Sequence, residues 1–329
     1  MVDYLVRRFV FMLITIAVIS VVAFILIQLP PGDYLSTYIA QLEEANTEVT
    51  ESELAALRQQ YGLGRPMHVQ YLKWIWGIVS RGDFGQSFQW NKPVKDLIWD
   101  RIALTAMVAM ASMVFTFVVG VPIGIYSALN KYTPGDFTFT VVGYVGLATP
   151  NFMLALVLMW IGFRYFGHSV GGLFSPRFQE EAWSLAKVAD LLVHLWVPVV
   201  VLGTAGTAGL IRVTRAMLMD ELQKAYVVTA RSKGVRESRL IFKYPVRIAL
   251  NPVASTIGWR LTEIISGAPI VAVVLSLPTT GPVLLRALLS QDMYLAGAFL
   301  LLLSVLTVLG TFISDVLLAA IDPRIRMAD

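Results

Sequence analysis

The chain has 329 residues, of which 57% are hydrophobic and only 15% are charged, and its mean hydropathy is +0.68. Soluble domains carry roughly 25% charged residues, so this composition excludes that class and indicates a polytopic membrane protein. The chain contains no cysteine, which excludes disulfides, thiolate metal sites and cysteine nucleophiles. The net charge of +4 does not indicate nucleic-acid binding, because the basic residues concentrate in loops between apolar runs, as the positive-inside rule describes.

The first apolar run covers residues 9–29 and follows Arg7 and Arg8. Its length matches the ~20 residues that a helix needs to cross a bilayer. A secretory signal peptide is the alternative, but the run is longer than the usual ~7–15-residue signal core, and Pro30 does not begin a small-residue cleavage site. We therefore predict a first transmembrane helix within residues 1–29, with the N-terminus inside.

Residues 41–98 form the only sizeable polar portion, and we predict an extracytoplasmic helical segment at residues 30–100. The spacing of Thr50 and Glu53 is that of a capping box and predicts a helix that ends at Gly62, and Pro66 predicts the start of a second helix. Residues 81–85 have the composition of a turn. Too few apolar residues remain for an independent core, which indicates a small helical cap.

Five further apolar runs follow in residues 101–329 and predict a five-helix core. Glycines and prolines interrupt several of them, and close helix packing explains these residues more simply than a role in a pathway. Six spans with both termini inside place every basic loop inside. The predicted fold class is an all-α polytopic membrane protein with six transmembrane helices, the last five at residues 102–129, 137–163, 188–211, 252–277 and 294–321.

The longest charged loop covers residues 212–250, between the fourth and fifth predicted spans. Residues 221–234 lack proline, favour helix formers and end at Gly234, a residue suited to a helix C-terminus. We predict a short helix outside the bilayer. A solvated basic loop that rests on anionic lipid headgroups is the alternative interpretation.

Motifs for chemistry are missing from the sequence. It contains no GxxxxGK[ST] phosphate loop, no HExxH metal helix and no GxSxG elbow, so we expect neither an enzyme nor a cofactor. Its three histidines lie in different predicted segments, so we expect packing roles for them and no metal site. These histidines are His68, His168 and His194.

Ionisable residues within the predicted spans are the more useful signal, because a charge at membrane depth is costly. Arg260 and Glu263 stand three residues apart on the fifth span, so their side chains share a helix face and can pair. Two interpretations stay open: the pair borders a substrate pathway, or it is neutralised and packed against another helix. We interpret Asp315 on the sixth span as a packing residue or a backbone cap.

The segment Tyr226-Val-Val-Thr-Ala-Arg-Ser-Lys-Gly234, together with residues 244–250, resembles the EAA loop of permease subunits of ABC importers. Its closest likeness is to the first permease of the oligopeptide/dipeptide class. The likeness covers nearly the whole chain, including residues 31–33, 81–85 and 322–326. It implies the ABC type I importer permease fold, in a bacterial or archaeal plasma membrane.

In this family the EAA loop forms a coupling helix that sits in a groove of a separate ATPase subunit. The resemblance therefore implies a transport subunit whose partners are a second homologous permease, two P-loop ATPases and an extracytoplasmic substrate-binding protein, besides membrane lipid. Small residues let a helix press closely into such a groove, and the basic residues would face either acidic ATPase residues or lipid headgroups. The implied coupling residues are Tyr226, Thr229, Ala230, Arg231, Lys233 and Gly234.

Departures from the family pattern affect the expected substrate. Tyr244 and Ile248 replace the His and Asn that are common in the motif, and Ala272 stands where peptide permeases commonly have Glu. The expected cargo is a small peptide or a similar solute. Alternatives in the same class are an oligosaccharide, an opine-like compound, a nickel complex or glutathione.

Two other classes of protein stay in view. A secondary transporter would show inverted repeats with broken helices, and the sequence has no convincing halves. A membrane-anchored receptor or scaffold would use the outer segment alone and would not need the basic inner loop. Both alternatives predict a chain that works without an ATPase.

Overall fold

A computed structural model describes residues 2–28, 66–87, 89–166, 170–179 and 181–321. The chain divides into two compact units. Unit 1 comprises residues 1–12, 105–278 and 307–329, and unit 2 comprises residues 13–104 and 279–306. The predicted helix at residues 51–62 lies outside the described residues.

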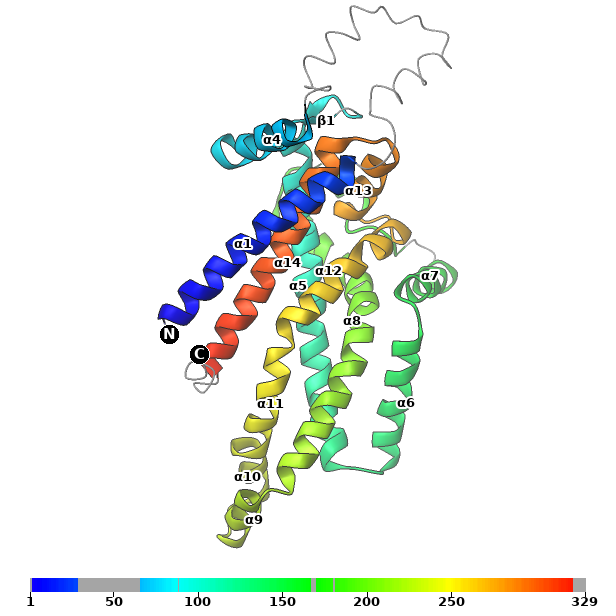
Figure 1. Cartoon of the computed structure of the whole chain (residues 1–329). Coiled ribbons are helices and arrows are strands. Elements are labelled where there is room, and N and C mark those ends of the chain that lie inside the picture. Colours follow the sequence, from blue (N-terminus) through cyan, green and yellow to red (C-terminus); the bar gives the residue numbers. More distant parts are fainter. Residues whose placement is uncertain (1, 29–65, 88, 167–169, 180, 322–329) are drawn as a thin grey trace, which may run out of the picture. The chain divides into compact units, whose positions relative to one another are not determined.

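The described chain is almost entirely helical, with one two-stranded antiparallel hairpin, β1 (Gln86–Ser87) and β2 (Lys92–Pro93). Figure 1 shows the elements coloured along the chain. The helices are α1 (Val2–Gln28), α4 (Met67–Arg81), α5 (Val94–Leu129), α6 (Pro134–Ala148), α7 (Asn151–Ile161), α8 (Leu185–Leu222), α9 (Ala225–Ser232), α10 (Glu237–Lys243), α11 (Pro245–Ser255), α12 (Ile257–Val274), α13 (Thr280–Leu289) and α14 (Met293–Ile321), with two short helical turns at Gly162–Phe166 and Pro176–Phe178.

Four helices in the described part of the chain are long and apolar enough to cross a membrane, namely α1, α5, α8 and α14. Two bent pairs, α6 with α7 and α10–α11 with α12, raise the number to six if each pair counts as one span. The predicted all-α polytopic class is therefore confirmed, and six spans is the upper count.

The predicted span at residues 137–163, with its interruptions at Gly143, Gly146 and Pro150, is divided into two helices. The chain breaks between α6 and α7, whose axes differ by 105°. Thr149 has an extended backbone (φ −85°, ψ 120°), as the residue before Pro150 prefers, and Pro150 offers no N–H to continue the helix.

The fifth predicted span and the turn after it also differ from expectation. Residues 252–277 do not form a single helix, because α11 ends at Ser255 and α12 begins at Ile257 after a bend of 51°. The turn predicted after residue 277 is short, since Thr280 already begins the ten-residue helix α13.

Glycines of the spans let helices of unit 1 approach closely. A Cβ built on Gly203 of α8 would lie 2.5 Å from Cδ1 of Phe115 in α5, and one on Gly146 of α6 would lie 2.7 Å from Cγ2 of Thr204 in α8. These separations are too short for any larger residue. The prediction that the span glycines serve close packing is confirmed at these contacts.

Asp315, interpreted from the sequence as a packing residue or a backbone cap, pairs with a basic residue of another helix. Asp315 of α14 forms an ion pair with Arg8 of α1, with 3.1 Å between Oδ2 and Nη1. Phe9 and Phe312 make an edge-to-face contact between the same two helices. The pair neutralises charge that would otherwise be costly beside an apolar helix.

In unit 2, α4 packs on the second half of α1. The hydroxyls of Tyr71 and Ser20 are hydrogen-bonded at 2.7 Å, and Phe24 contacts both Tyr71 and Trp74. The helix begins directly after Pro66 and ends where Gly82 adopts a left-handed backbone, with φ at +64°. The predicted helix start and the following turn are both confirmed.

The β-hairpin is fixed to the start of α14 through Asp292, which is fully buried. Its carboxylate accepts hydrogen bonds from the Ser87 hydroxyl, the Gln89 N–H and the Leu295 N–H. Ser290 also donates to the Gln89 side chain. Bonds between residues about 200 positions apart therefore hold the hairpin in place.

Candidate functional site: coupling segment, ion pair and membrane groove

The coupling segment, defined here as residues 223–244, begins where α8 ends at Leu222, well past the predicted end of the span at residue 211. Lys224 has an extended backbone (φ −69°, ψ 147°), and α9 begins at the next residue. The helix expected at residues 221–234 is therefore divided: its first two residues belong to α8, and residues 225–232 form the shorter helix α9.

The C-terminus of α9 is closed by a Schellman motif. Gly234 adopts a left-handed backbone with φ at +76°. Its N–H donates to the Arg231 carbonyl at 3.0 Å, and the Val235 N–H donates to the Ala230 carbonyl at 3.3 Å. Glycine suits this position because an L side chain is strained in the left-handed region. The prediction that the helix ends at Gly234 is confirmed.

A side-chain bond joins the start of α9 to the end of α8. The Tyr226 hydroxyl donates to Oε2 of Glu221 at 2.7 Å, and neighbouring Val227 is fully buried. Burial, followed by the hydrogen bond with Glu221, raises the pKa of Tyr226 above its ordinary value. The hydroxyl consequently stays protonated and keeps donating across the physiological range.

The two basic residues at the end of α9, Arg231 and Lys233, differ in their contacts. Arg231 is engaged within the segment, since its Nη2 and Nε lie 2.6 and 3.1 Å from the two carboxylate oxygens of Glu237 in α10. Lys233, the C-terminal cap of α9, is exposed, and so is Thr229. The contact of Arg231 with Glu237 was not foreseen from the sequence, which offered only partner or lipid contacts for this side chain.

An apolar cluster supports the base of the coupling segment. Leu218 of α8 is fully buried and packs with Ala128 of α5 and with Val246 and Ala249 of α11. Five partly buried side chains surround this cluster: Ile125, Met219, Leu222, Ile241 and Leu250. The two ends of the segment are thus held in one core, while α9 itself projects from it (Figure 1).

Arg260 and Glu263 pair on α12 as predicted, with 3.0 Å between Nη1 and Oε2. The Arg260 side chain is 16% exposed and that of Glu263 is 47% exposed. Arg260 lies against α8, where a Cβ on Gly209 would be 2.7 Å from Nη2 of the guanidinium. The pair is therefore packed against a second helix on one side and open on the other.

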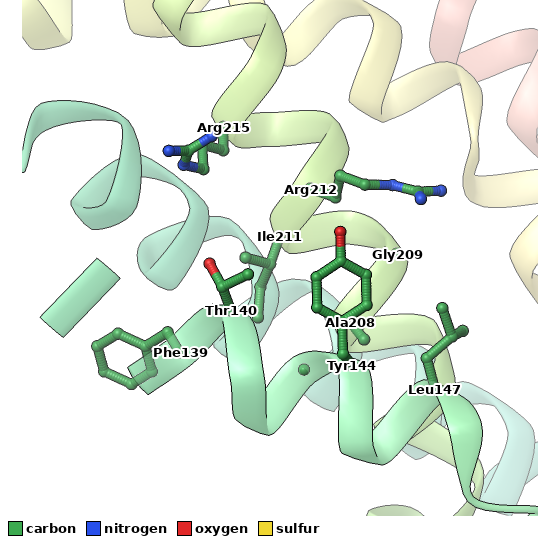
Figure 2. Close-up of a pocket in the computed structure, with 10 residues that line it drawn as sticks. Phe139, Thr140, Tyr144, Leu147, Ala208, Gly209, Ile211, Arg212 and Arg215 are labelled. Atoms are coloured by element: carbon green, nitrogen blue, oxygen red, sulfur yellow. The ribbon is translucent and has the colours of Figure 1, made fainter. Parts of the chain in front are cut away.

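A groove lies between α6 and α8 (Figure 2), with a volume of about 90 Å³. The polar side chains in its lining are Arg212, Arg215, Tyr144 and Thr140. The complete lining is Phe139, Thr140, Gly143, Tyr144 and Leu147 of α6 with Ala208, Gly209, Ile211, Arg212 and Arg215 of α8.

A buried ion pair at one end of this groove was missed from the sequence. Asp136, in the first turn of α6, receives two parallel hydrogen bonds from Arg215 of α8, at 3.1 Å to Oδ1 and 2.9 Å to Oδ2. The Tyr132 N–H also donates to this carboxylate. A usable signal was that both charges stand at the ends of predicted spans that face the same side of the membrane.

The part of the chain that the structure describes contains no cluster of three or more His, Asp or Glu residues suited to a metal ion. Nδ1 of His194 lies 2.8 Å from the Asp190 carbonyl of the same helix, so this histidine has a local structural partner. His168 lies outside the described residues. The apolar spans and the charged helix outside them define the chain as a polytopic membrane protein.

Family comparisons narrow this class. Residues 120–327 match the family of binding-protein-dependent transport system inner membrane components, and residues 1–109 match its N-terminal region. The chain belongs to this family and is a permease of an ABC importer of the peptide class.

Curated relatives extend over the whole chain. The oligopeptide transport system permease protein AppB of Bacillus subtilis (strain 168) is 31% identical over 99% of this chain and 100% of its own length. The glutathione transport system permease protein GsiC of Salmonella paratyphi A is 30% identical over 99% of both chains. The dipeptide transport system permease protein DppB of Alkalihalophilus pseudofirmus is 27% identical over 99% of this chain and 100% of its own length.

Proposed function

We propose that this permease forms half of the translocation pathway for a small peptide or a similar solute. An extracytoplasmic binding protein delivers the solute, a second homologous permease forms the other half, and two P-loop ATPase subunits hydrolyse ATP. Both termini and the coupling segment lie in the cytoplasm, an orientation supported by the basic residues of that segment.

The projecting helix α9 carries this proposal. It is closed at its C-terminus by its own backbone, tied to α8 by Tyr226, and exposed at Thr229 and Lys233. A short helix that keeps its shape without a partner can enter a groove of the ATPase with little ordering cost. Because α8 runs without a break from the membrane to Glu221, a push on α9 reaches the spans directly.

Arg260 and Glu263 are proposed to border the pathway. The 47% exposure of the Glu263 side chain supports this role, since a pair that serves only packing would be covered on both sides. Arg260→Ala and Glu263→Ala variants that fold normally should then transport more slowly than the parent. Unchanged transport in both variants would assign the pair to packing against Gly209.

The nature of the substrate is the finer part of the proposal. The relatives are named for oligopeptides, dipeptides and glutathione, which are all peptide-like. Ala272 is buried, and an alanine side chain has no carboxylate to offer to the ammonium group of a peptide. Glutathione and the other non-standard cargoes of the class thus stay as alternatives to simple peptides.

Co-purification tests the proposed assembly. The tagged chain is extracted gently from its native membrane, and mass spectrometry identifies the proteins that accompany it in a fixed ratio. A homologous permease and P-loop ATPases are expected, and a co-purifying binding protein can be screened for ligands. Recovery of the chain alone, with transport retained in liposomes without ATP, would instead identify a secondary transporter.

A further inference from the structure

The groove between α6 and α8 changes character along its length. Arg212 and Arg215 lie toward the end of α8 that leads into the coupling segment, whereas Leu147 and Ala208 lie toward the opposite end. Figure 2 shows the hydroxyl of Tyr144 pointing toward the Arg212 side chain. The groove is therefore polar at one end and apolar at the other.

The charges at the polar end do not cancel. Asp136 is 3% exposed and accepts two hydrogen bonds from Arg215, so these two side chains neutralise each other. Arg212 is exposed and forms no hydrogen bond or ion pair with any of the residues that the structure describes. Two arginines and one carboxylate leave a net charge of +1 at this end of the groove.

The polar end of the groove also lies where an apolar stretch of α8 ends. Residues 195–211 of α8 contain no charged residue, and Arg212 is the first charge after them. The flank of α6 beside the groove is apolar and exposed, with Val142 at 63% and Val145 at 61% exposure. A cation at the boundary of an apolar surface is where a lipid phosphate lies when its acyl chains run along the helices.

We infer that this groove binds one anionic phospholipid, with its phosphate on Arg212 and the start of an acyl chain between Leu147 and Ala208. The hydroxyl of Tyr144 adds a second donor to the phosphate, and Arg215 holds the floor of the site through Asp136. Gly143 lines the groove opposite Ala208 and has no side chain to occupy it. A Cβ built on Gly143 would lie 3.6 Å from Cβ of Ala208, so a larger side chain at position 143 would fill the space between α6 and α8. The proposed cytoplasmic orientation of the coupling segment assigns the lipid to the cytoplasmic leaflet, but the binding itself does not depend on it.

Native mass spectrometry of the full chain, purified with the subunits that accompany it, tests this site. Dioleoylphosphatidylglycerol, dioleoylphosphatidylcholine and inorganic phosphate are titrated separately. We expect one phosphatidylglycerol to bind about tenfold more tightly in the parent than in Arg212→Gln, because a hydrogen bond to a charged group contributes about 1.4 kcal/mol or more. Phosphatidylcholine and free phosphate should bind more weakly than phosphatidylglycerol.

Matched variants separate this site from general attraction to a basic surface. Arg239→Gln removes another exposed arginine, from α10, and should leave the affinity unchanged, whereas Gly143→Leu should abolish the tight binding without changing any charge. Equal affinity in the parent, Arg212→Gln and Gly143→Leu would overturn the inference. So would equal binding of the two lipids, or free phosphate that binds as tightly as phosphatidylglycerol.

Discussion

The β-hairpin and the coupling segment are both polar segments of an apolar chain. Bonds between residues distant in sequence hold the hairpin, whereas bonds between residues close in sequence hold the helices of the coupling segment. The hairpin depends on buried Asp292, whose partners Ser87 and Gln89 lie about 200 residues away in sequence. The helices of the coupling segment use bonds that span at most six residues, such as Arg231 with Glu237. The hairpin therefore depends on the long-range fold, whereas the helices of the coupling segment are held mainly by local bonds, as the proposed docking on a partner requires.

Removing the buried acceptor of the hairpin should have the largest effect on stability. Asp292→Ala leaves the donors of Ser87, Gln89 and Leu295 without their acceptor, and each buried unpaired donor costs about 1–3 kcal/mol. We expect a loss of about 3 kcal/mol or more in the free energy of unfolding, measured by denaturant titration in detergent.

Asp83→Ala is the matched control for the hairpin. Its carboxylate also bonds a backbone N–H, that of Gly85, but at an exposed position. The expected change is within about 0.5 kcal/mol, as for most surface substitutions. Similar losses in Asp292→Ala and Asp83→Ala would remove the distinction between a buried anchor and a surface contact.

Substitution of Gly234 should reduce stability less than Asp292→Ala does, but it should reduce the proposed coupling to the ATPase. Gly234→Ala places a Cβ on a residue with a left-handed backbone, which costs roughly 1 kcal/mol. The strain is confined to the Schellman motif at the end of α9. No atom lies within 4 Å of a Cβ at this position, so steric clash does not contribute. Substrate-stimulated ATP hydrolysis in the assembled complex should fall, while membrane insertion is unchanged.

Gly234→Asn tests whether backbone strain, and not merely the absence of glycine, causes the loss of stimulated hydrolysis. Asparagine tolerates the left-handed region better than alanine, so this variant should retain more of the stimulated hydrolysis. Gly234→Arg adds bulk to the same strain and should abolish the stimulation. Full stimulation in Gly234→Arg would show that the end of α9 does not meet the ATPase.

The smallest effect is expected at the bond between Tyr226 and Glu221. Tyr226→Phe removes one partly exposed hydrogen bond and should lower stability by about 0.5–1 kcal/mol. The pKa of Tyr226 is raised in the folded chain, so the tyrosine stabilises the fold below its ordinary pKa of 10.0, and that contribution is lost as the pH rises above this value. The phenylalanine variant should lack this alkaline decrease in a pH titration of unfolding, and an identical decrease in both proteins would contradict the assignment.

Local features of this fold could be predicted from the sequence. Hydropathy located the spans, Pro66 marked the start of α4, and Gly234 marked the end of α9, because each depends on neighbouring residues only. The resemblance of residues 226–234 to the EAA loop likewise indicated the family, because that motif is a continuous stretch of chain.

Long-range features could not be predicted in the same way. Asp136 pairs with Arg215 and Arg8 pairs with Asp315 only because separate helices meet in one register, which hydropathy does not encode. The angle of the break at Pro150 could not be predicted either, since prolines are often accommodated within transmembrane helices and only the packed structure decides whether the helix bends or ends.

Cysteine labelling tests the central claim, that α9 docks on a partner, most directly. The chain has no native cysteine, so Thr229→Cys on α9 and Ser80→Cys on exposed α4 each provide a unique reactive site. Maleimide labelling is compared for the chain alone and for the complex with its ATPase subunits. We predict that the ATPase strongly slows labelling at position 229 and leaves position 80 unchanged. Equal labelling of position 229 with and without the ATPase would contradict the account.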